Sequence, residues 1–251
     1  MKRLHKLNIK IFADGADRAR MLEMYRNPLI KGFTTNPTLM RKAGVTDYRA
    51  FAKAVLADIK DRPISFEVFA DEFDEMERQA LEIASWGSNV VVKIPVTNTR
   101  GESSDKLVRR LAQAGVVLNV TALMTLSQAR TSAAWLTGGP GGYISVFAGR
   151  IADTGRDPIH MMAESVKSLQ AFPGVQLIWA SPREVLDLFH AEMAGCHVIT
   201  MTTDLLKKLS LIGKDLQEFS LDTVKMFYED GKKAGYNLEK VAASAAGSRF
   251  L

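Results

Sequence analysis

The chain has 251 residues, of which 47% are hydrophobic and 24% are charged, a composition typical of a globular protein with a sizeable core. Its net charge of +5 arises from basic residues spread along the chain in pairs among acidic neighbours. Because no basic stripe interleaved with aromatic residues is visible, the composition argues against nucleic-acid binding and suits a small anionic substrate such as a sugar phosphate.

The first residues, MKRLHKLNIKIFADG, are basic but pass directly into a strand-like run, without the apolar segment and cleavage site of a secretion signal. No apolar run approaches the roughly 18 residues that a membrane-spanning helix requires. The one cysteine, Cys196, cannot form an internal disulfide, which suits a reducing compartment. We therefore expect a cytoplasmic protein that does not contact membranes.

Apolar runs of strand length recur along the chain, at residues 7–14, 29–36, 64–70, 89–96, 116–124, 143–150, 175–181 and 196–202. Most of the segments between them have apolar residues at helical spacing. The runs are nearly continuous rather than alternating, as expected for parallel strands covered on both faces. Without a linker or a compositional break, this pattern favours a single (β/α)8 barrel over residues 1–251 rather than a doubly wound open sheet.

Two further segments bear on this organisation. The glycine cluster GGPGG at 138–142 precedes a predicted strand, so we expect a tight turn on the amino-terminal face of the barrel rather than a phosphate-binding loop. The tail from about 215 to 251 carries apolar residues at helical spacing, which predicts an extra C-terminal helix. This helix either caps the barrel or packs on a neighbouring subunit.

Polar residues cluster where the predicted strands end, and in a barrel of this kind reactive side chains lie at the carboxyl ends of strands. They are Asp14, Thr34, Asn36, Glu67, Lys93, Asn119, Thr121, Ser145, Arg150, Ser181 and Arg183. Lys93, Asn119 and Ser145 recur at intervals of 26 residues, which predicts similar depths around one mouth. Each residue alone has an ordinary structural explanation, but a contribution from seven consecutive strands predicts a site.

Lys93 interrupts the β-branched run NVVVKIPV, and burying a lysine costs several kcal/mol unless it is paired or used. Three interpretations compete. Lys93 is a structural partner of Asp14 or Glu67, a point charge for an anionic ligand, or a nucleophile whose free amine attacks a carbonyl. Two carboxylic acids and two arginines in the same set favour the nucleophile, because a Schiff-base sugar-phosphate enzyme requires them.

Metal-assisted enolate chemistry is the rival, and it needs histidine or carboxylate ligands at the mouth. The four histidines, His5, His160, His190 and His197, do not lie at the carboxyl end of any predicted strand. The sequence therefore predicts neither a metal nor another cofactor.

The segments FADG, GFTTNPTLM, FEVFA, VVVKIPVT, VLNVTALMTLSQA, ISVFAGRIADTGRD and ASPRE resemble, in order and spacing, the motifs of the transaldolase family, which includes the fructose-6-phosphate aldolases. The resemblance runs from about residue 10 to 210. It implies a (β/α)8 enzyme that works through a Schiff base without a metal, on the lysine of the KIP motif, which is Lys93 here.

The resemblance also implies roles for the other residues. Asp14 would be the acid/base for the substrate C4 hydroxyl, and Glu67 and Thr121 would position the water that shuttles protons. Asn36, Asn119 and Ser145, with Thr34 beside them, would hold the hydroxyls of a dihydroxyacetone unit. The phosphate would be bound by Arg150, Ser181 and Arg183.

Two positions favour a transaldolase over an aldolase within the family. Glu67 and Phe147 resemble transaldolases, whereas the aldolases typically carry glutamine and tyrosine there, and a tyrosine hydroxyl can protonate the enamine. The expected donor is fructose 6-phosphate or sedoheptulose 7-phosphate, with an aldose phosphate acceptor, as in the pentose phosphate pathway. The alternatives are an aldolase that releases dihydroxyacetone, an enzyme for an unusual sugar, and a barrel that binds sugar phosphate without turnover.

Other positions depart from the family pattern. Trp179 is bulkier than expected before ASPR, and Thr202, Thr203 and Asp204 stand where relatives have proline or small apolar residues. A carboxylate such as Asp204 beside the phosphate site would repel a dianion. The family resemblance further implies a homo-oligomer, often a decamer, in which the C-terminal helix reaches a neighbour.

Overall fold

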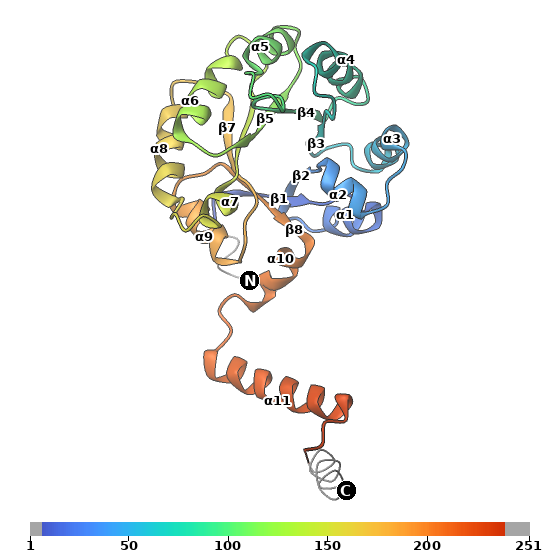
Figure 1. Cartoon of the computed structure of the whole chain (residues 1–251), viewed down its shortest axis with the longest axis vertical. Helices are drawn as coiled ribbons and strands as arrows, with labels where there is room; N and C mark the ends of the chain where they lie inside the picture. The colour runs from blue at the N-terminus through green and yellow to red at the C-terminus, as the bar shows by residue number, and fades with distance from the viewer. Residues whose placement is uncertain (1–6, 239–251) are drawn as a thin grey trace, which may run out of the picture. The chain divides into compact units, whose positions relative to one another are not determined.

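A computed structural model describes residues 7–238, and its strands form one closed parallel barrel in chain order (Figure 1). The strands are β1 (Lys10–Asp14), β2 (Ile30–Thr34), β3 (Ile64–Glu67), β4 (Val90–Pro95), β5 (Leu118–Leu123), β6 (Gly142–Val146), β7 (Val175–Trp179) and β8 (Val198–Thr202). The predicted single (β/α)8 barrel is confirmed.

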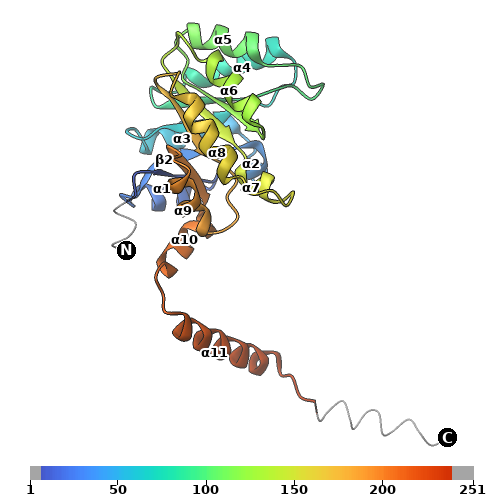
Figure 2. The ribbon, with the colours of Figure 1, turned by 90° about the vertical axis from the view of Figure 1, so that its left-hand side faces the viewer.

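Helices surround the strands on the outside (Figures 1 and 2). They are α1 (Arg18–Tyr25), α2 (Pro37–Lys42), α3 (Tyr48–Asp58), α4 (Phe73–Ala84), α5 (Asp105–Gln113), α6 (Leu126–Trp135), α7 (Ala148–Ala152), α8 (Ile159–Leu169), α9 (Leu186–Met193) and α10 (Thr203–Lys208), followed by a 3-10 turn at Leu209–Leu211.

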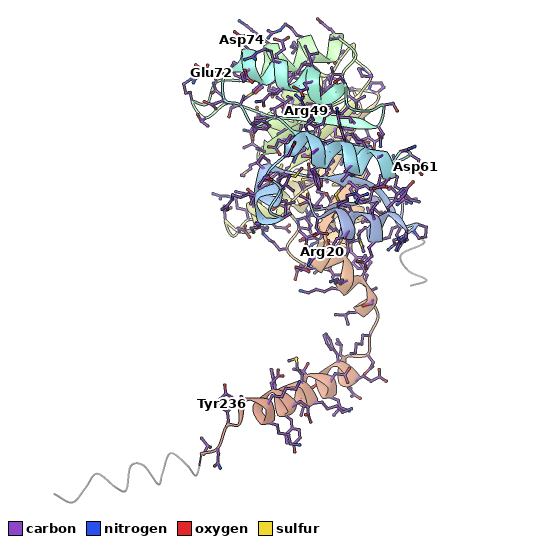
Figure 3. All side chains as sticks on the ribbon, turned by 90° about the vertical axis from the view of Figure 1, so that its right-hand side faces the viewer. Arg20, Arg49, Asp61, Glu72, Asp74 and Tyr236 are labelled. Atoms are coloured by element: carbon purple, nitrogen blue, oxygen red, sulfur yellow. The ribbon has the colours of Figure 1, made fainter. Side chains whose placement is uncertain are left out.

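Several helices begin at a residue whose side chain caps the first turn. Asp17, Asn36 and Asp47 each accept a backbone hydrogen bond as the N-cap of α1, α2 and α3, which satisfies amides that the first turn leaves free. On α4, Met76, Ala80 and Ile83 are buried, while Asp74, Arg78 and Glu82 are exposed. Arg49 on α3, for example, pairs with Glu82 on α4 at the surface (Figure 3).

Side chains alternate between the two faces of the barrel wall, so every second residue of a strand points inward. Phe12, Ile178, Ala180 and Val198 form a buried apolar cluster inside the barrel. The residues one position away, such as Trp179 and Ile199, are completely buried. This alternation lets strands with continuous apolar sequence carry a polar residue inward at their carboxyl ends.

The glycine cluster at 138–142 forms a turn that leads into β6, at the end of the barrel opposite the carboxyl ends of the strands. Gly141 has φ +88° and its Cβ position lies 2.5 Å from the carbonyl oxygen of Gly174, so a larger residue does not fit. The interpretation as a tight turn is therefore correct.

The chain divides into two units at the bond between Leu209 and Ser210. The second unit contains α11 (Leu216–Ala234), capped by Asp215 at its start and by Gly235, at φ +66°, at its end. The extra C-terminal helix is thus confirmed, while residues 239–251 of the predicted tail lie outside the described residues. Within residues 7–238, no helix combines the length and the apolar character needed to span a bilayer.

Candidate active site

A cavity of about 520 Å³ opens at the carboxyl ends of the strands, and it gathers almost all of the residues singled out in the sequence. Its lining includes Asp14, Thr34, Asn36, Glu67, Lys93, Thr121, Ser145, Phe147, Arg150, Ser181 and Arg183. Asn119 is fully buried and reaches the cavity only through its hydrogen bond with Ser145. The remaining lining comes mainly from α2 and from Thr200 on β8.

Lys93 is 6% exposed and makes two polar contacts inside the cavity. Its Nζ lies 2.9 Å from Oε2 of Glu67 and donates, also at 2.9 Å, to the backbone carbonyl of Thr35. The two oxygens compensate for the loss of water around the ammonium, which would otherwise be costly. The pairing with Glu67 predicted by the structural interpretation exists, and it holds the amine where a ligand in the cavity meets it.

Strand register explains the closeness of Glu67, Lys93 and Asn119. Glu67 is the register partner of Lys93, which is the partner of Asn119. The partner of Asn119 on β6 is Tyr143, not Ser145, and the β5–β6 register shifts beyond Val120. Because the strands of a closed barrel are tilted, register partners are staggered along the barrel axis, so this offset leaves the predicted similar depth of Ser145 open. The Oγ of Ser145 donates to Oδ1 of Asn119 at 2.7 Å.

Asp14 ends β1 and accepts a hydrogen bond from Oγ1 of Thr34 at 2.7 Å. Burial raises the pKa of Asp14 above its ordinary value of 3.8, while the positive charge of Lys93 and the Thr34 hydrogen bond act in the opposite direction. Glu67 adds a smaller upward effect on the same pKa. A carboxyl group in this setting is suited to exchange a proton with a ligand.

Thr121, in the wall of the cavity, carries a buried hydroxyl without a hydrogen-bond partner among the described residues. The next residue, Ala122, has φ +66°, and the β5–β6 pairing is irregular here. Since buried hydroxyls are rarely left unpaired, this one is a candidate contact for substrate or for a bound water.

β6 is shorter than predicted, ending at Val146 rather than extending to residue 150. Phe147 is the N-cap of the short helix α7, and Arg150 lies on that helix instead of on the strand. The guanidinium carbon of Arg150 lies 5.6 Å from the centroid of the Phe147 ring. This cation–π contact places a positive charge at the rim of the cavity.

Arg183 lies beside α7, with its Cγ atom 3.4 Å from the Cβ position of Gly149, and the groups that hold it include one that the sequence pattern did not indicate. Its guanidinium pairs with Asp153, with Nε 2.9 Å from Oδ1, and Nη1 donates to Ser181 Oγ at 3.0 Å. The Arg183 hydrogen bond lowers the pKa of Asp153, and the carboxylate raises the pKa of the guanidinium. No motif spacing singled out Asp153, because it follows a helix that the sequence pattern did not predict.

Tyr48 was also missed, since it lies in a predicted helix rather than at a strand end. Its hydroxyl donates to the backbone carbonyl of Glu67 and accepts from the Glu67 amide, both at 2.9 Å. Burial raises the pKa of Tyr48 well above its ordinary value. The phenol therefore stays protonated and fixes the backbone at the residue that contacts Lys93.

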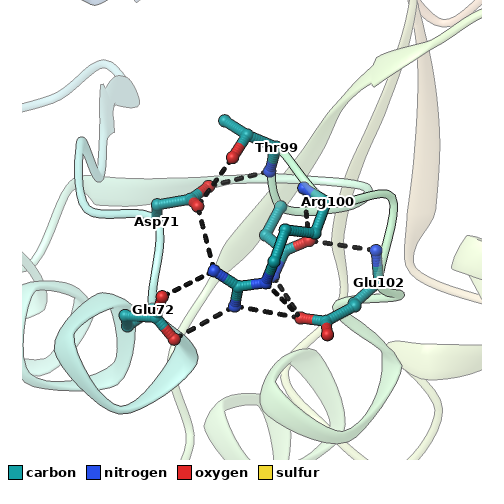
Figure 4. Close-up of polar contacts among 6 residues, drawn as sticks. Asp71, Glu72, Thr99, Arg100 and Glu102 are labelled. Atoms are coloured by element: carbon teal, nitrogen blue, oxygen red, sulfur yellow. Dashed lines mark hydrogen bonds and ion pairs between the residues drawn. The ribbon is translucent and has the colours of Figure 1, made fainter.

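The loops that follow β3 and β4 are tied together by Arg100, as Figure 4 shows. Arg100 bonds both oxygens of Glu72 and also contacts Glu102 and Asp71. Asp71 in turn accepts from the backbone amide and the hydroxyl of Thr99. These loops extend the two strands that carry Glu67 and Lys93, so the Arg100 cluster braces one side of the mouth.

A second cavity, of about 420 Å³, shares Asp14, Leu39 and Lys42 with the first. The divergent residues Thr202, Thr203 and Asp204 line this second cavity and not the one that contains the two arginines. The expected repulsion of a phosphate by Asp204 is therefore not supported. Trp179 is completely buried and lines neither cavity.

None of the histidines between residues 7 and 238 lines the cavity. His160 lies on α8, His190 on α9, and His197 precedes β8 and accepts a hydrogen bond from the backbone amide of Leu177. His5 lies outside the described residues. In the part of the chain from residue 7 to 238, no group of three His, Cys, Asp or Glu side chains is placed to hold a metal ion.

Fold and site together define a (β/α)8 enzyme-like barrel with a buried lysine–carboxylate pair, a second carboxyl group and two rim arginines in one cavity. A match to the family model described as Transaldolase/Fructose-6-phosphate aldolase covers residues 11–247. The chain belongs to the transaldolase/fructose-6-phosphate aldolase family. It is therefore an enzyme of the transferase/aldolase type.

Relatives support this assignment. The chain is 35% identical over 221 residues to a probable transaldolase 2 of Listeria monocytogenes, covering 85% of this chain and 95% of the relative. It is 32% identical over 202 residues to a probable transaldolase of Dehalococcoides mccartyi, covering 80% and 90%. Each relative is matched over nearly its whole length, so the likeness includes the complete barrel.

Solved structures show the fold at a greater distance. The dihydrodipicolinate synthase of Rhodopseudomonas palustris superposes with a TM-score of 0.53 at 15% identity, covering 77% of this chain and 69% of that chain. A 2,3-dimethylmalate lyase superposes with a TM-score of 0.52 at 12% identity, covering 98% and 96%. At these identities the likeness concerns the barrel architecture alone.

Proposed function

We propose that the protein is a transaldolase that moves a dihydroxyacetone unit from fructose 6-phosphate or sedoheptulose 7-phosphate to an aldose phosphate through a Schiff base on Lys93. One observation carries the proposal. The Lys93 amine lies buried beside Glu67, in the same cavity as the Asp14 carboxyl group and the Arg150 and Arg183 guanidinium groups. Binding a sugar phosphate without turnover would not require a buried amine.

Schiff-base formation begins with proton loss from Lys93, because only the free amine attacks a carbonyl. The Glu67 carboxylate is the nearest base, 2.9 Å from Nζ. Attack at the ketose C2 forms a carbinolamine, which loses its hydroxyl as water and becomes a protonated imine. Thr121 lines the same cavity, and its unpaired hydroxyl supports the proposed role of positioning that water.

Cleavage follows from the positive charge on the imine. When the C4 hydroxyl gives its proton to Asp14, the electron pair of the C3–C4 bond moves into the imine, the aldose leaves, and an enamine remains on Lys93. Reversal of the same steps with a second aldose completes the transfer. Asp14 suits both directions because burial and Lys93 act on its pKa with opposite signs.

The fate of the enamine separates transfer from release. A transaldolase must keep it unprotonated until the acceptor arrives, and Phe147 in the cavity lining has no hydroxyl to protonate it. We therefore favour transfer over an aldolase that releases free dihydroxyacetone. The two guanidinium groups at the rim give a phosphate charge-assisted hydrogen bonds, which orient the distal end of the sugar.

Borohydride reduction in the presence of fructose 6-phosphate, followed by mass mapping, tests the proposal. We expect a three-carbon adduct on Lys93 and no turnover by Lys93→Met. An unmodified Lys93, or turnover by Lys93→Met, would contradict the Schiff base. Free dihydroxyacetone produced at full rate without an aldose acceptor would move the assignment to an aldolase.

We further propose that the enzyme acts in the cytoplasm, in the pentose phosphate pathway, as a homo-oligomer that meets neither membranes nor nucleic acid. Leu216, Phe219, Val224 and Phe227 are exposed at helical spacing on α11, a pattern that suits packing on a second copy of the chain. Light scattering of Val224→Glu and Phe227→Glu variants tests this point. Unchanged molar mass in both would contradict a role of α11 in assembly.

A further inference from the structure

Two threonine hydroxyls, one on each of the strands next to β1, form a hydrogen-bonded chain that ends at Asp14. β1 lies between β2 and β8 in the barrel. Oγ1 of Thr34 on β2 bonds Oδ1 of Asp14 at 2.7 Å, and Oγ1 of Thr34 also contacts Oγ1 of Thr200 on β8. Both threonines are nearly inaccessible, at 3% and 6% exposure. The sequence pattern does not single out Thr200, because it lies within β8, two residues before the end of the strand, and its partner is 166 residues away.

Counting hydrogens gives the chain a direction. A threonine hydroxyl has one hydrogen, and that of Thr34 is donated to Asp14. The hydrogen in the Thr34–Thr200 contact must therefore come from Thr200. Both hydrogens point toward the carboxylate, and a donor that itself accepts a hydrogen bond becomes a stronger donor.

We propose that Thr200 is a positioning residue that acts through Thr34 to orient Asp14 and to favour its ionised form. The inference rests on the proposed function, in which Asp14 takes the proton of the C4 hydroxyl. Once Asp14 is protonated it can donate to Thr34, which can then donate to Thr200. This reversal takes from the Thr200 hydrogen its acceptor, Oγ1 of Thr34, so the chain favours the ionised form of Asp14.

Other charged groups also face Asp14, and a Thr200 variant leaves all of them in place. Lys93 and Glu67 act on its pKa directly. The remaining groups line the two cavities that meet at Asp14; they are Asp17, Arg20, Lys42, Arg150, Arg183 and Asp204. A change in the titration of Asp14 in a Thr200 variant is therefore attributable to the lost hydroxyl.

The test compares Thr200→Val, which keeps the shape and removes the hydroxyl, with Thr200→Ser, which keeps the hydroxyl. The pH profile of kcat/KM is measured with fructose 6-phosphate and an aldose phosphate. Weakening the ionised form raises the pKa of the base, so we expect the acidic limb of Thr200→Val to move up by roughly half to one pH unit. Thr200→Ser should restore the wild-type limb, and Ser132→Ala, a buried hydroxyl on α6 outside both cavities, should not move it.

An unchanged acidic limb in Thr200→Val, or a limb that Thr200→Ser does not restore, would overturn the inference. Borohydride trapping on the same samples distinguishes a failure of this inference from a failure of the proposed function. If only the role of Thr200 is wrong, a Lys93 adduct still forms in the wild type and in every Thr200 variant. Should wild-type Lys93 form no adduct, carboxyl 13C NMR titration of Asp14, assigned with Asp14→Asn, still decides. The pKa must then rise in Thr200→Val and return in Thr200→Ser, and equal pKa values in all three proteins would overturn the inference.

Discussion

The Nζ atom of Lys93 and the Oε2 atom of Glu67 lie 2.9 Å apart because the two residues are register partners on adjacent strands. A parallel barrel places register partners on the same face of the wall, so the pair points into the cavity without any help from a loop. The amine and the carboxylate are thus positioned by two strands rather than by loops, which favours a precisely held site.

Glu67→Gln tests the carboxylate as a base. The amide keeps the size of the side chain but cannot take the proton that Lys93 must lose, so we expect Schiff-base formation to slow by roughly 10²- to 10³-fold. Single-turnover borohydride trapping measures the rate directly. Glu72→Gln, an exposed carboxylate of the Arg100 cluster, serves as the control and should trap normally. Normal trapping by Glu67→Gln would assign Lys93 deprotonation to another group.

Phe147→Tyr tests the control of the enamine. The added hydroxyl lies in the cavity lining and can donate a proton to the enamine on Lys93. We expect free dihydroxyacetone release without an acceptor to rise by at least about tenfold. The measurement is an enzymatic assay of dihydroxyacetone with and without an aldose phosphate. Phe147→Leu lacks the hydroxyl, and an equal rise in that variant would attribute release to lost packing instead.

Arg183→Leu tests phosphate recognition at the rim. Removing a charge-assisted contact should lower kcat/KM for fructose 6-phosphate by roughly 10- to 100-fold. Unphosphorylated fructose makes no such contact, so its slower turnover should change little. Arg130→Leu on α6 removes the same charge outside the cavity and should leave both substrates unaffected. Parallel losses for both sugars would mean that Arg183 supports the structure of the site rather than the phosphate.

The barrel and most of its site could be predicted from the sequence because the relevant signals are local. The apolar run NVVVKIPV, for example, predicts a buried strand, and the single lysine within it, Lys93, marks a polar side chain that points into the barrel. Thr200, Tyr48 and Asp153 could not be predicted in the same way, since their roles depend on contacts between distant segments. The early end of β6 was also missed, because the apolar residues of α7 extend the strand pattern without a break.

Gly149→Ala tests a close backbone approach behind the rim. A Cβ atom at this position would lie 1.6 Å from the carbonyl oxygen of Ser181, the residue beside Arg183 that holds a left-handed φ of +61°. Relieving the clash requires a backbone shift, so we expect the free energy of unfolding to fall by about 3 kcal/mol or more. Thermal and urea unfolding measure the change.

Gly155→Ala supplies the matched control for Gly149→Ala. Gly155 has φ +77° but open space around its Cβ position, so alanine there meets only the backbone penalty of about 1 kcal/mol. A loss at Gly149 no larger than the loss at Gly155 would show that the α7–Ser181 contact is easily relaxed.

Asp14→Asn tests the electrostatic cost of burying the proposed acid/base. Because burial raises the pKa of Asp14 above 3.8, the folded state binds its proton more readily than the unfolded state does. This group's contribution to stability is therefore present below pH 3.8 and is lost as pH rises through the folded-state pKa. At neutral pH the asparagine variant removes the buried charge, still accepts from Thr34, and should be more stable by about 1 kcal/mol while losing catalysis. Urea unfolding from pH 4 to pH 8 measures the free energy of unfolding of both proteins, with the exposed Asp204→Asn variant as control. We expect the difference in free energy between Asp14→Asn and the wild type to widen as the pH rises. A difference that narrows would mean that Lys93 stabilises the carboxylate by more than burial disfavours it.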